Sequence, residues 1–241
     1  MHHFIFSKQD TWISSGSNTI NNESFRDQNF GKDQILEVKK EFFNSKFNHQ
    51  TRALVQFSGT EFTAMSQSIV DGKITSPKFY LRLYESEGNK NTSTNYTLVF
   101  QPISQSWTEG TGKFGDNPKN TNGCSWENSS NPSGGSVISW SNAGATTLNV
   151  SSSVQTFFNQ TPDIEVEVTN MVNGWLNNQY SNNGMLVSFS ASLETSASSV
   201  DAKLKFFSKN THTIYPPKLE IRWDDSTNNN NGDLTELSVT G

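Results

Sequence analysis

The sequence predicts an all-β protein, an antiparallel jelly-roll β-sandwich with one short helix. Apolar residues recur at every second position in many short segments, which is the pattern of strands with one buried face. Helical periodicity is confined to a single segment. Aromatic residues are plentiful, with 17 Phe and 6 Trp in 241 residues, and each buried ring removes roughly 150–250 Å² from water. These observations indicate an aromatic core inside a coat rich in Asn, Ser and Thr.

The strands are expected where the alternation is clearest, and residues 78–85 give the best example. Phe79, Leu81 and Leu83 occupy every second position there, so one face of this strand should be buried and the other exposed. The predicted strands are residues 10–13, 34–40, 52–57, 78–85, 96–103, 147–150, 164–168, 185–189, 202–207 and 218–223.

One amphipathic helix is predicted after Thr169, whose hydroxyl could cap its first turn. Met171, Val172, Trp175 and Leu176 fall on one face of that helix. A helix of about two turns is not stable alone. We therefore expect it to pack on a sheet and plug one end of the sandwich.

A long polar segment, residues 104–137, separates two of the predicted strands. Loops longer than about 15 residues in a compact domain are usually functional or disordered. Trp107 and Trp126 favour order, because each needs a place to pack.

The domain prediction is one sandwich over residues 1–224, followed by an Asn-rich linker and C-terminal arm over residues 225–241. The arm resumes a weak alternation after the linker. Its apolar residues are the predicted partner-docking residues, namely Leu234, Leu237 and Val239.

Charge and composition exclude several classes of function. The net charge is −5 and the pI about 5.4, whereas nucleic-acid binders usually carry a basic stripe, so no nucleic-acid partner is expected. No apolar run approaches 18 residues, and the first residues do not resemble a signal peptide. We therefore expect no membrane partner, and assembly in the cytoplasm of the producing cell.

Catalytic motifs are absent from the sequence: there is no Gly-rich phosphate loop, HExxH, CxxC or GxSxG. A depolymerase or lyase would need converging acids or a Tyr-His-Arg cluster, and no spacing nominates one. The prediction is a binding or structural protein rather than an enzyme.

Sugar binding is an alternative supported by aromatic residues near loops and on one strand face. Exposed rings stack on sugars, while Arg, Asn and Asp bind hydroxyls. For the tryptophans, the competing interpretation is that each anchors a loop to the core. The candidate carbohydrate-binding residues are Trp140, Trp126, Tyr80, Arg82 and Tyr84.

A structural calcium ion is the one cofactor considered, since loops rich in Asp and Asn supply oxygen ligands. Asp10, Asn29 and Asp33 could converge near the first strands. The competing interpretation is that they form surface turns.

Several segments together resemble the DNRLRE family, a β-sandwich module of bacterial surface proteins that is grouped with carbohydrate-binding modules. The resemblance covers about residues 10–224. The segments that carry it are residues 52–57, 78–84, 106–112, 125–128, 166–169 with 174–177, 183–187, and 204–209 with 215–221.

The segment Thr211-His212-Thr213-Ile214-Tyr215-Pro216-Pro217 looks most like versions carried in structural proteins of marine tailed phages. This resemblance implies a structural component of a phage virion: a tail, baseplate, fibre or capsid-decoration protein that acts as a rigid docking module. It further implies other virion proteins as partners and oligomeric assembly within the virion. The alternative is a carbohydrate-binding module that recognises host surface glycans.

Overall fold

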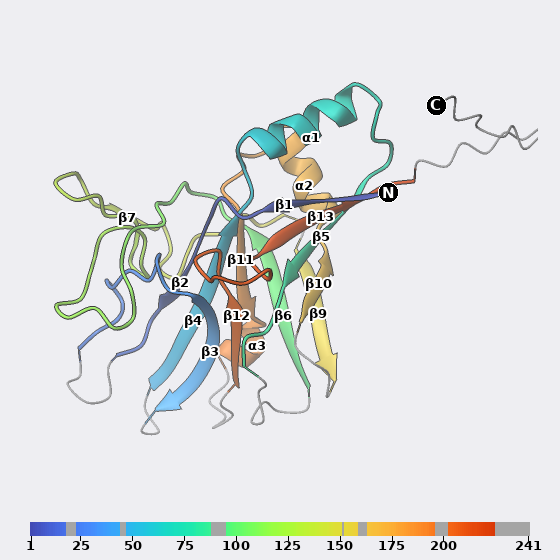
Figure 1. The fold of residues 1–241 in the computed structure, drawn as a ribbon. Helices are drawn as coiled ribbons and strands as arrows, with labels where there is room; N and C mark the ends of the chain where they lie inside the picture. Colours follow the sequence, from blue (N-terminus) through green and yellow to red (C-terminus); the bar gives the residue numbers. More distant parts are fainter. Residues whose placement is uncertain are drawn as a thin grey trace, which may run out of the picture.

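Two antiparallel sheets packed face to face form the protein in the computed structural model (Figure 1). The structure describes residues 1–17, 23–43, 47–87, 95–150, 152–158, 163–195 and 202–224. The predicted all-β sandwich is confirmed.

The smaller sheet, sheet A, has the strand order β1-β13-β5-β10. These strands are β1 (His2–Phe6), β13 (Lys218–Arg222), β5 (Lys78–Leu83) and β10 (Ile164–Glu167). The antiparallel pairing of β1 with β13 brings the start of the chain beside the end of the last strand. The α-ammonium of Met1 donates a 2.6 Å hydrogen bond to the carbonyl of Trp223.

The larger sheet, sheet B, has the order β12-β3-β4-β11-β6-β9. These strands are β12 (Ala202–Phe207), β3 (Ile35–Phe43), β4 (Phe47–Gln56), β11 (Met185–Phe189), β6 (Asn95–Pro102) and β9 (Ser153–Phe158). The strand β2 (Gln9–Ser14) also pairs with β4. Thr51 of β4 is the branch point, because it is paired with Lys39 of β3 and with Ser14 of β2. Beyond Thr51, β3 parts from β4 and β2 takes its place.

The main core lies between the two sheets and is rich in aromatic side chains. In β5 the burial alternates as predicted, with Phe79, Leu81 and Leu83 fully buried. Other buried aromatic residues in this core are Phe57, Tyr96, Phe100, Phe157, Trp175, Phe189 and Phe206.

A second core lies on the outer face of sheet B, under residues 103–147, which we call the loop layer. It packs on Leu54 of β4 and Leu186 of β11. Trp107 and Trp126 are buried in it, so the expected order of the long polar segment is confirmed. Gly110 in this layer has φ +82°, a conformation that glycine adopts without strain. The loop layer includes the short strands β7 (Asn128–Ser130) and β8 (Ile138–Ser139).

The predicted helix is present as α2 (Thr169–Leu176). Thr169 is not its N-cap, however: its hydroxyl accepts a 3.0 Å hydrogen bond from the backbone N–H of Phe79. The helix therefore is tied to β5 by its first residue.

The sequence predicted one short helix, and the described part of the structure has two more that it did not predict. The helix α1 (Thr60–Val70) buries only Met65, which leaves little apolar periodicity to detect. It lies with α2 at one end of the sandwich (Figure 1), where the rings of Phe62 and Trp175 are 6.4 Å apart. The other is the four-residue α3 (Ala191–Glu194).

The predicted strands also need corrections. Residues 147–150 form no strand, and Thr147 makes only an isolated bridge to Ile103. The strands β1 and β9 were missed; β1 buries only Ile5, and β9 exposes Val154. The predicted docking residues Leu234, Leu237 and Val239 lie outside the described residues. Within the described part of the chain, no helix is long and apolar enough to cross a membrane.

Candidate functional site

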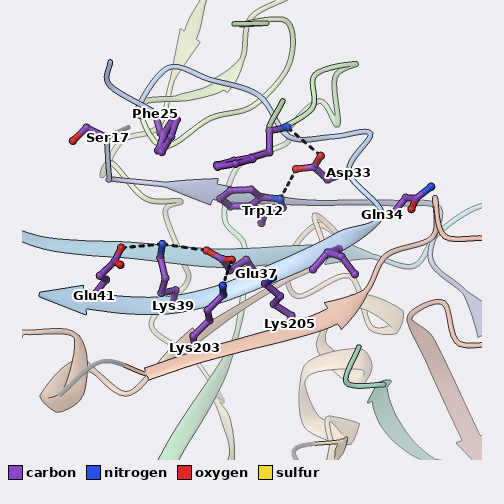
Figure 2. Close-up of a pocket in the computed structure, with 12 residues that line it drawn as sticks. Trp12, Ser17, Phe25, Asp33, Gln34, Glu37, Lys39, Glu41, Lys203 and Lys205 are labelled. Atoms are coloured by element: carbon purple, nitrogen blue, oxygen red, sulfur yellow. Dashed lines mark hydrogen bonds and ion pairs between the residues drawn. The ribbon is translucent and has the colours of Figure 1, made fainter. Parts of the chain in front are cut away.

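A groove of about 610 Å³ lies where β2 and β3 separate. One side comes from β2 and two loops, and the other from the outward faces of β3 and β12. The residues lining it are Trp12, Ser17, Phe25, Asp33, Gln34, Ile35, Glu37, Lys39, Glu41, Phe114, Lys203 and Lys205. Figure 2 shows Trp12 and Phe25 on one side, facing the charged side chains of β3 on the other. Its volume is within the roughly 300–1,000 Å³ range of small-molecule sites.

The first side is an aromatic wall formed by Trp12, Phe25 and Phe114. Trp12 is only 5% exposed, and its indole stacks on Phe30 with the ring centroids 3.8 Å apart. Trp12 therefore supports the wall from behind, and the rings that a ligand can reach are those of Phe114 and Phe25. The ring of Phe114 lies 6.1 Å from Trp12 and 5.5 Å from Phe25. Phe114 is 56% exposed, so its ring is open to a ligand in the groove.

Asp33 holds this wall together. Its Oδ2 accepts a 2.9 Å hydrogen bond from Nε1 of Trp12, and its Oδ1 accepts a 3.0 Å bond from the backbone N–H of Phe114. Burial raises the pKa of Asp33, and these two hydrogen bonds oppose the shift. The carboxylate thus fixes a ring from β2 relative to a ring from the loop layer.

The opposite side is a charged floor formed by Glu37, Lys39 and Glu41 of β3 with Lys203 and Lys205 of β12. The ammonium of Lys39 lies 3.4 Å from Glu37 and 3.1 Å from Glu41. Burial lowers the pKa of Lys39, but the two carboxylates outweigh it and the pKa lies above its ordinary value. Lys203 reaches Glu37 at 3.6 Å. The floor therefore offers cations and carboxylates in alternation.

Such an arrangement suits a polyhydroxylated ligand. A sugar ring has an apolar C–H face that can pack on an aromatic ring, and its hydroxyls both donate and accept hydrogen bonds. Carboxylates accept from hydroxyls, whereas ammonium groups donate to them. The wall and the floor of this groove supply these three kinds of contact on facing sides.

The structure corrects the prediction for Trp126 and Trp140. Both are buried in the second core, at 6% and 5% exposure. The guanidinium of Arg52 lies 4.9 Å from the Trp126 ring, and Nε1 of Trp140 donates to the carbonyl of Ser125. A covered ring cannot stack on a sugar, so both tryptophans act as loop anchors, the competing interpretation.

Tyr80 and Arg82 share the outer face of β5, as the alternation predicted. Arg82 donates to the carboxylates of Glu220, at 2.8 Å, and Glu165. The guanidinium of Arg222 covers the Tyr80 ring at 4.1 Å. These groups are therefore engaged with one another, and the face lies on sheet A, away from the groove.

Tyr84 follows β5 by one residue and also has close neighbours. Its ring lies 5.1 Å from the ring of Tyr215 and 5.2 Å from the ammonium of Lys218. The ammonium of Lys218 is also near the rings of Phe4 and Phe6. The structure does not bring Tyr84 into the groove.

Of the residues considered for calcium, Asn29 and Asp33 are fully engaged in hydrogen bonds, whereas Asp10 accepts from Ser7 and the Lys209 N–H through Oδ2 and its buried Oδ1 has no hydrogen-bond partner. Asn29 donates to the carbonyls of Glu109 and Cys124 through Nδ2 and accepts from the N–H groups of Gly31 and Gly112 through Oδ1. Asp33 uses both of its oxygens in the aromatic wall. The described residues contain no group of three or more His, Cys, Asp or Glu side chains placed to hold a metal ion.

The fold is that of a β-sandwich module with a groove beside sheet B that is lined by aromatic and charged side chains. The chain belongs to carbohydrate-binding module family 96, whose family model matches residues 3–134. The matched region runs from β1 to β7 and contains the aromatic wall, Asp33 and the β3 side of the floor. No curated protein matches the chain. The family is one of binding modules, in agreement with the expectation of a binding protein.

The sequence reasoning missed the residues that form the aromatic wall. Trp12 was placed on a predicted strand but given no role, and Phe25 and Phe114 stand in polar segments without periodicity. A single aromatic residue in a polar loop, such as Phe114 between Lys113 and Gly115, is the one signal that could have drawn attention to it.

Proposed function

We propose that the protein binds polysaccharide in the groove between the aromatic wall and the charged floor. The observation that carries this proposal is the exposed ring of Phe114, which lies 6.1 Å from Trp12 and lines the same groove as Lys39 and Glu37. The family match supports a carbohydrate ligand, the alternative that the sequence left open, and does not bear on a place in a virion.

Affinity electrophoresis and isothermal titration calorimetry against soluble neutral and acidic polysaccharides test the proposal. We expect at least one polysaccharide to retard the protein. Phe114→Ala should then weaken binding roughly threefold to tenfold, since a favourable ring contact contributes about 0.5–1.5 kcal/mol. Val70→Ala is the matched control, because Val70 is 77% exposed on α1, outside the groove. Equal binding by Phe114→Ala and the wild type would contradict the proposal.

The phage virion role rests on the sequence resemblance alone and is our second proposal. It includes the kinship to the DNRLRE family, oligomeric assembly with other virion proteins, and docking through Leu234, Leu237 and Val239. Mass spectrometry of purified phage particles tests it, and consistent absence of the chain from such particles would end it.

A further inference from the structure

A second pocket lies on the other flank of the loop layer. It has a volume of about 330 Å³ and is lined by β4, β6, β11, α3 and the end of the loop layer. Its lining residues are Arg52, Val99, Gln101, Ala145, Thr147, Leu186, Ser188, Phe189, Ala191 and Glu194. It shares no lining residue with the groove. Sheet B therefore carries this pocket as well as the groove.

The charges in this pocket cancel one another. Arg52 donates to both carboxylate oxygens of Glu194, at 3.1 Å from Nε and 2.7 Å from Nη2. Its Nη1 donates to the carbonyl of Gly144 at 2.7 Å. This bidentate pair is fixed and charge-balanced, and the other lining residues are uncharged. An ionic ligand would have to break the pair, so the pocket favours a neutral one.

Three polar side chains in the pocket, those of Gln101, Thr147 and Ser188, make no hydrogen bond within the described part of the chain. Ser188 is only 6% exposed. Its Oγ nevertheless keeps access to solvent, and Gln101 and Thr147 are half-buried, so all three groups are open to the pocket. The amide and the two hydroxyls both donate and accept, and they stand beside the apolar side chains of Leu186 and Val99.

We propose that this pocket is a second carbohydrate subsite, which binds an uncharged sugar unit. The unpaired polar groups match sugar hydroxyls, and the apolar side chains match a C–H face. The volume, near the lower end of the range for small-molecule sites, limits the ligand to a short stretch of a glycan. This inference deepens the proposed function and rests on it for the class of ligand.

Amide NMR of the ¹⁵N-labelled full chain separates the two sites. The probes are neutral cello-, xylo-, manno- and galacto-oligosaccharides, added one at a time. We expect at least one to shift the side-chain NH₂ of Gln101 and the backbone amides of Thr147 and Ser188. A Gln101→Leu/Thr147→Val double variant should weaken that binding roughly threefold to tenfold, the effect of losing hydrogen bonds to a ligand. Val70→Ala, at an exposed position that lines neither site, should leave it unchanged.

Each outcome decides between the two sites. Shifts confined to the groove would overturn the second subsite and leave the proposed function intact. Shifts confined to the pocket would support the subsite and count against the groove. If none of the four probes perturbs the pocket, the inference of a neutral-sugar subsite is wrong, whatever the groove binds. Unchanged near-ultraviolet circular dichroism of the double variant establishes that it is folded.

Discussion

Trp12 and Phe114 are far apart in the chain, yet one carboxylate holds both. Asp33 accepts the indole N–H of Trp12 and the backbone N–H of Phe114, so the two rings lie 6.1 Å apart. The aromatic wall is thus set by a buried acceptor rather than by ring contacts alone.

Asp33→Asn should weaken polysaccharide binding in the groove. The amide has one acceptor oxygen, so its NH₂ would face either the indole N–H or the Phe114 N–H, and one hydrogen bond is lost. We expect a loss of affinity of roughly threefold to tenfold, equivalent to about 0.5–1.5 kcal/mol, measured by calorimetry. Asp71→Asn, just after the exposed helix α1, is the matched control. If Asp33→Asn binds as well as Asp71→Asn, the carboxylate does not position the wall.

Asn29→Ala should destabilise the fold strongly. The Asn29 side chain is fully buried and makes four hydrogen bonds, three of which join the segment before β3 to the loop layer. Removing it leaves backbone groups unpaired, at a cost of about 3 kcal/mol or more. Urea denaturation measures the change. Asn149→Ala, at an exposed position, should alter the free energy of unfolding by less than about 0.5 kcal/mol. Similar losses in both variants would show that the hydrogen bonds of Asn29 do not stabilise the fold.

Asp10→Asn should stabilise the protein in a pH-dependent way. Burial raises the pKa of Asp10 from 3.8 to about 7, opposed by hydrogen bonds from the Lys209 N–H and the Ser7 hydroxyl and reinforced by Glu109. The folded state therefore binds the proton more tightly than the unfolded state. Below about pH 4 the Asp10 carboxyl is protonated in both states and does not lower the free energy of unfolding. Its destabilising effect grows as the pH rises towards 7.

The amide that replaces the carboxyl in the Asp10→Asn variant keeps an oxygen for both donors and carries no charge. We expect its stabilisation over the wild type to be roughly 1–3 kcal/mol larger at pH 8 than at pH 4.5, since each pKa unit is about 1.4 kcal/mol. Thermal unfolding across this range measures it. A difference independent of pH would show that Asp10 does not titrate as described.

Trp140→Ala should act on stability and not on binding. The side chain is buried beside Trp126 and Cys124 in the second core, so truncation should cost about 3–5 kcal/mol. Trp140→Phe should keep most of the packing. Affinity electrophoresis of Trp140→Phe at a temperature where it is folded should match the wild type. Selective loss of retention would restore Trp140 as a ligand-binding residue.

The sequence predicted the parts of the fold whose burial alternates regularly. β12 matches residues 202–207, because it buries every second residue. β11 matches residues 185–189 for another reason, because it is a short, mainly apolar run that is buried throughout. By contrast, β1 buries one residue and α1 buries only Met65. Elements held by a single anchor leave almost no periodic pattern, so they could not be predicted.

The site was harder to predict than the fold because exposure depends on tertiary packing. Trp140 stands between two serines, a context that leaves both sugar binding and loop anchoring open, and the loop layer buries it. Phe114 is open to solvent, and it belongs to the groove only through its contacts with Asp33, Trp12 and Phe25, which are all distant in the sequence. Such a relation between distant segments leaves no local trace in the sequence.

The bond between Met1 and Trp223 has a consequence for how the module can be connected. The first and last strands lie side by side and run in opposite directions. Residue 1 and residue 223 are therefore neighbours at the same edge of the sandwich. A short peptide bridging residue 224 to residue 1 would close the chain into a ring. Such a ring could be cut elsewhere, for instance in the turn after α1, and the permuted chain should still build both sheets.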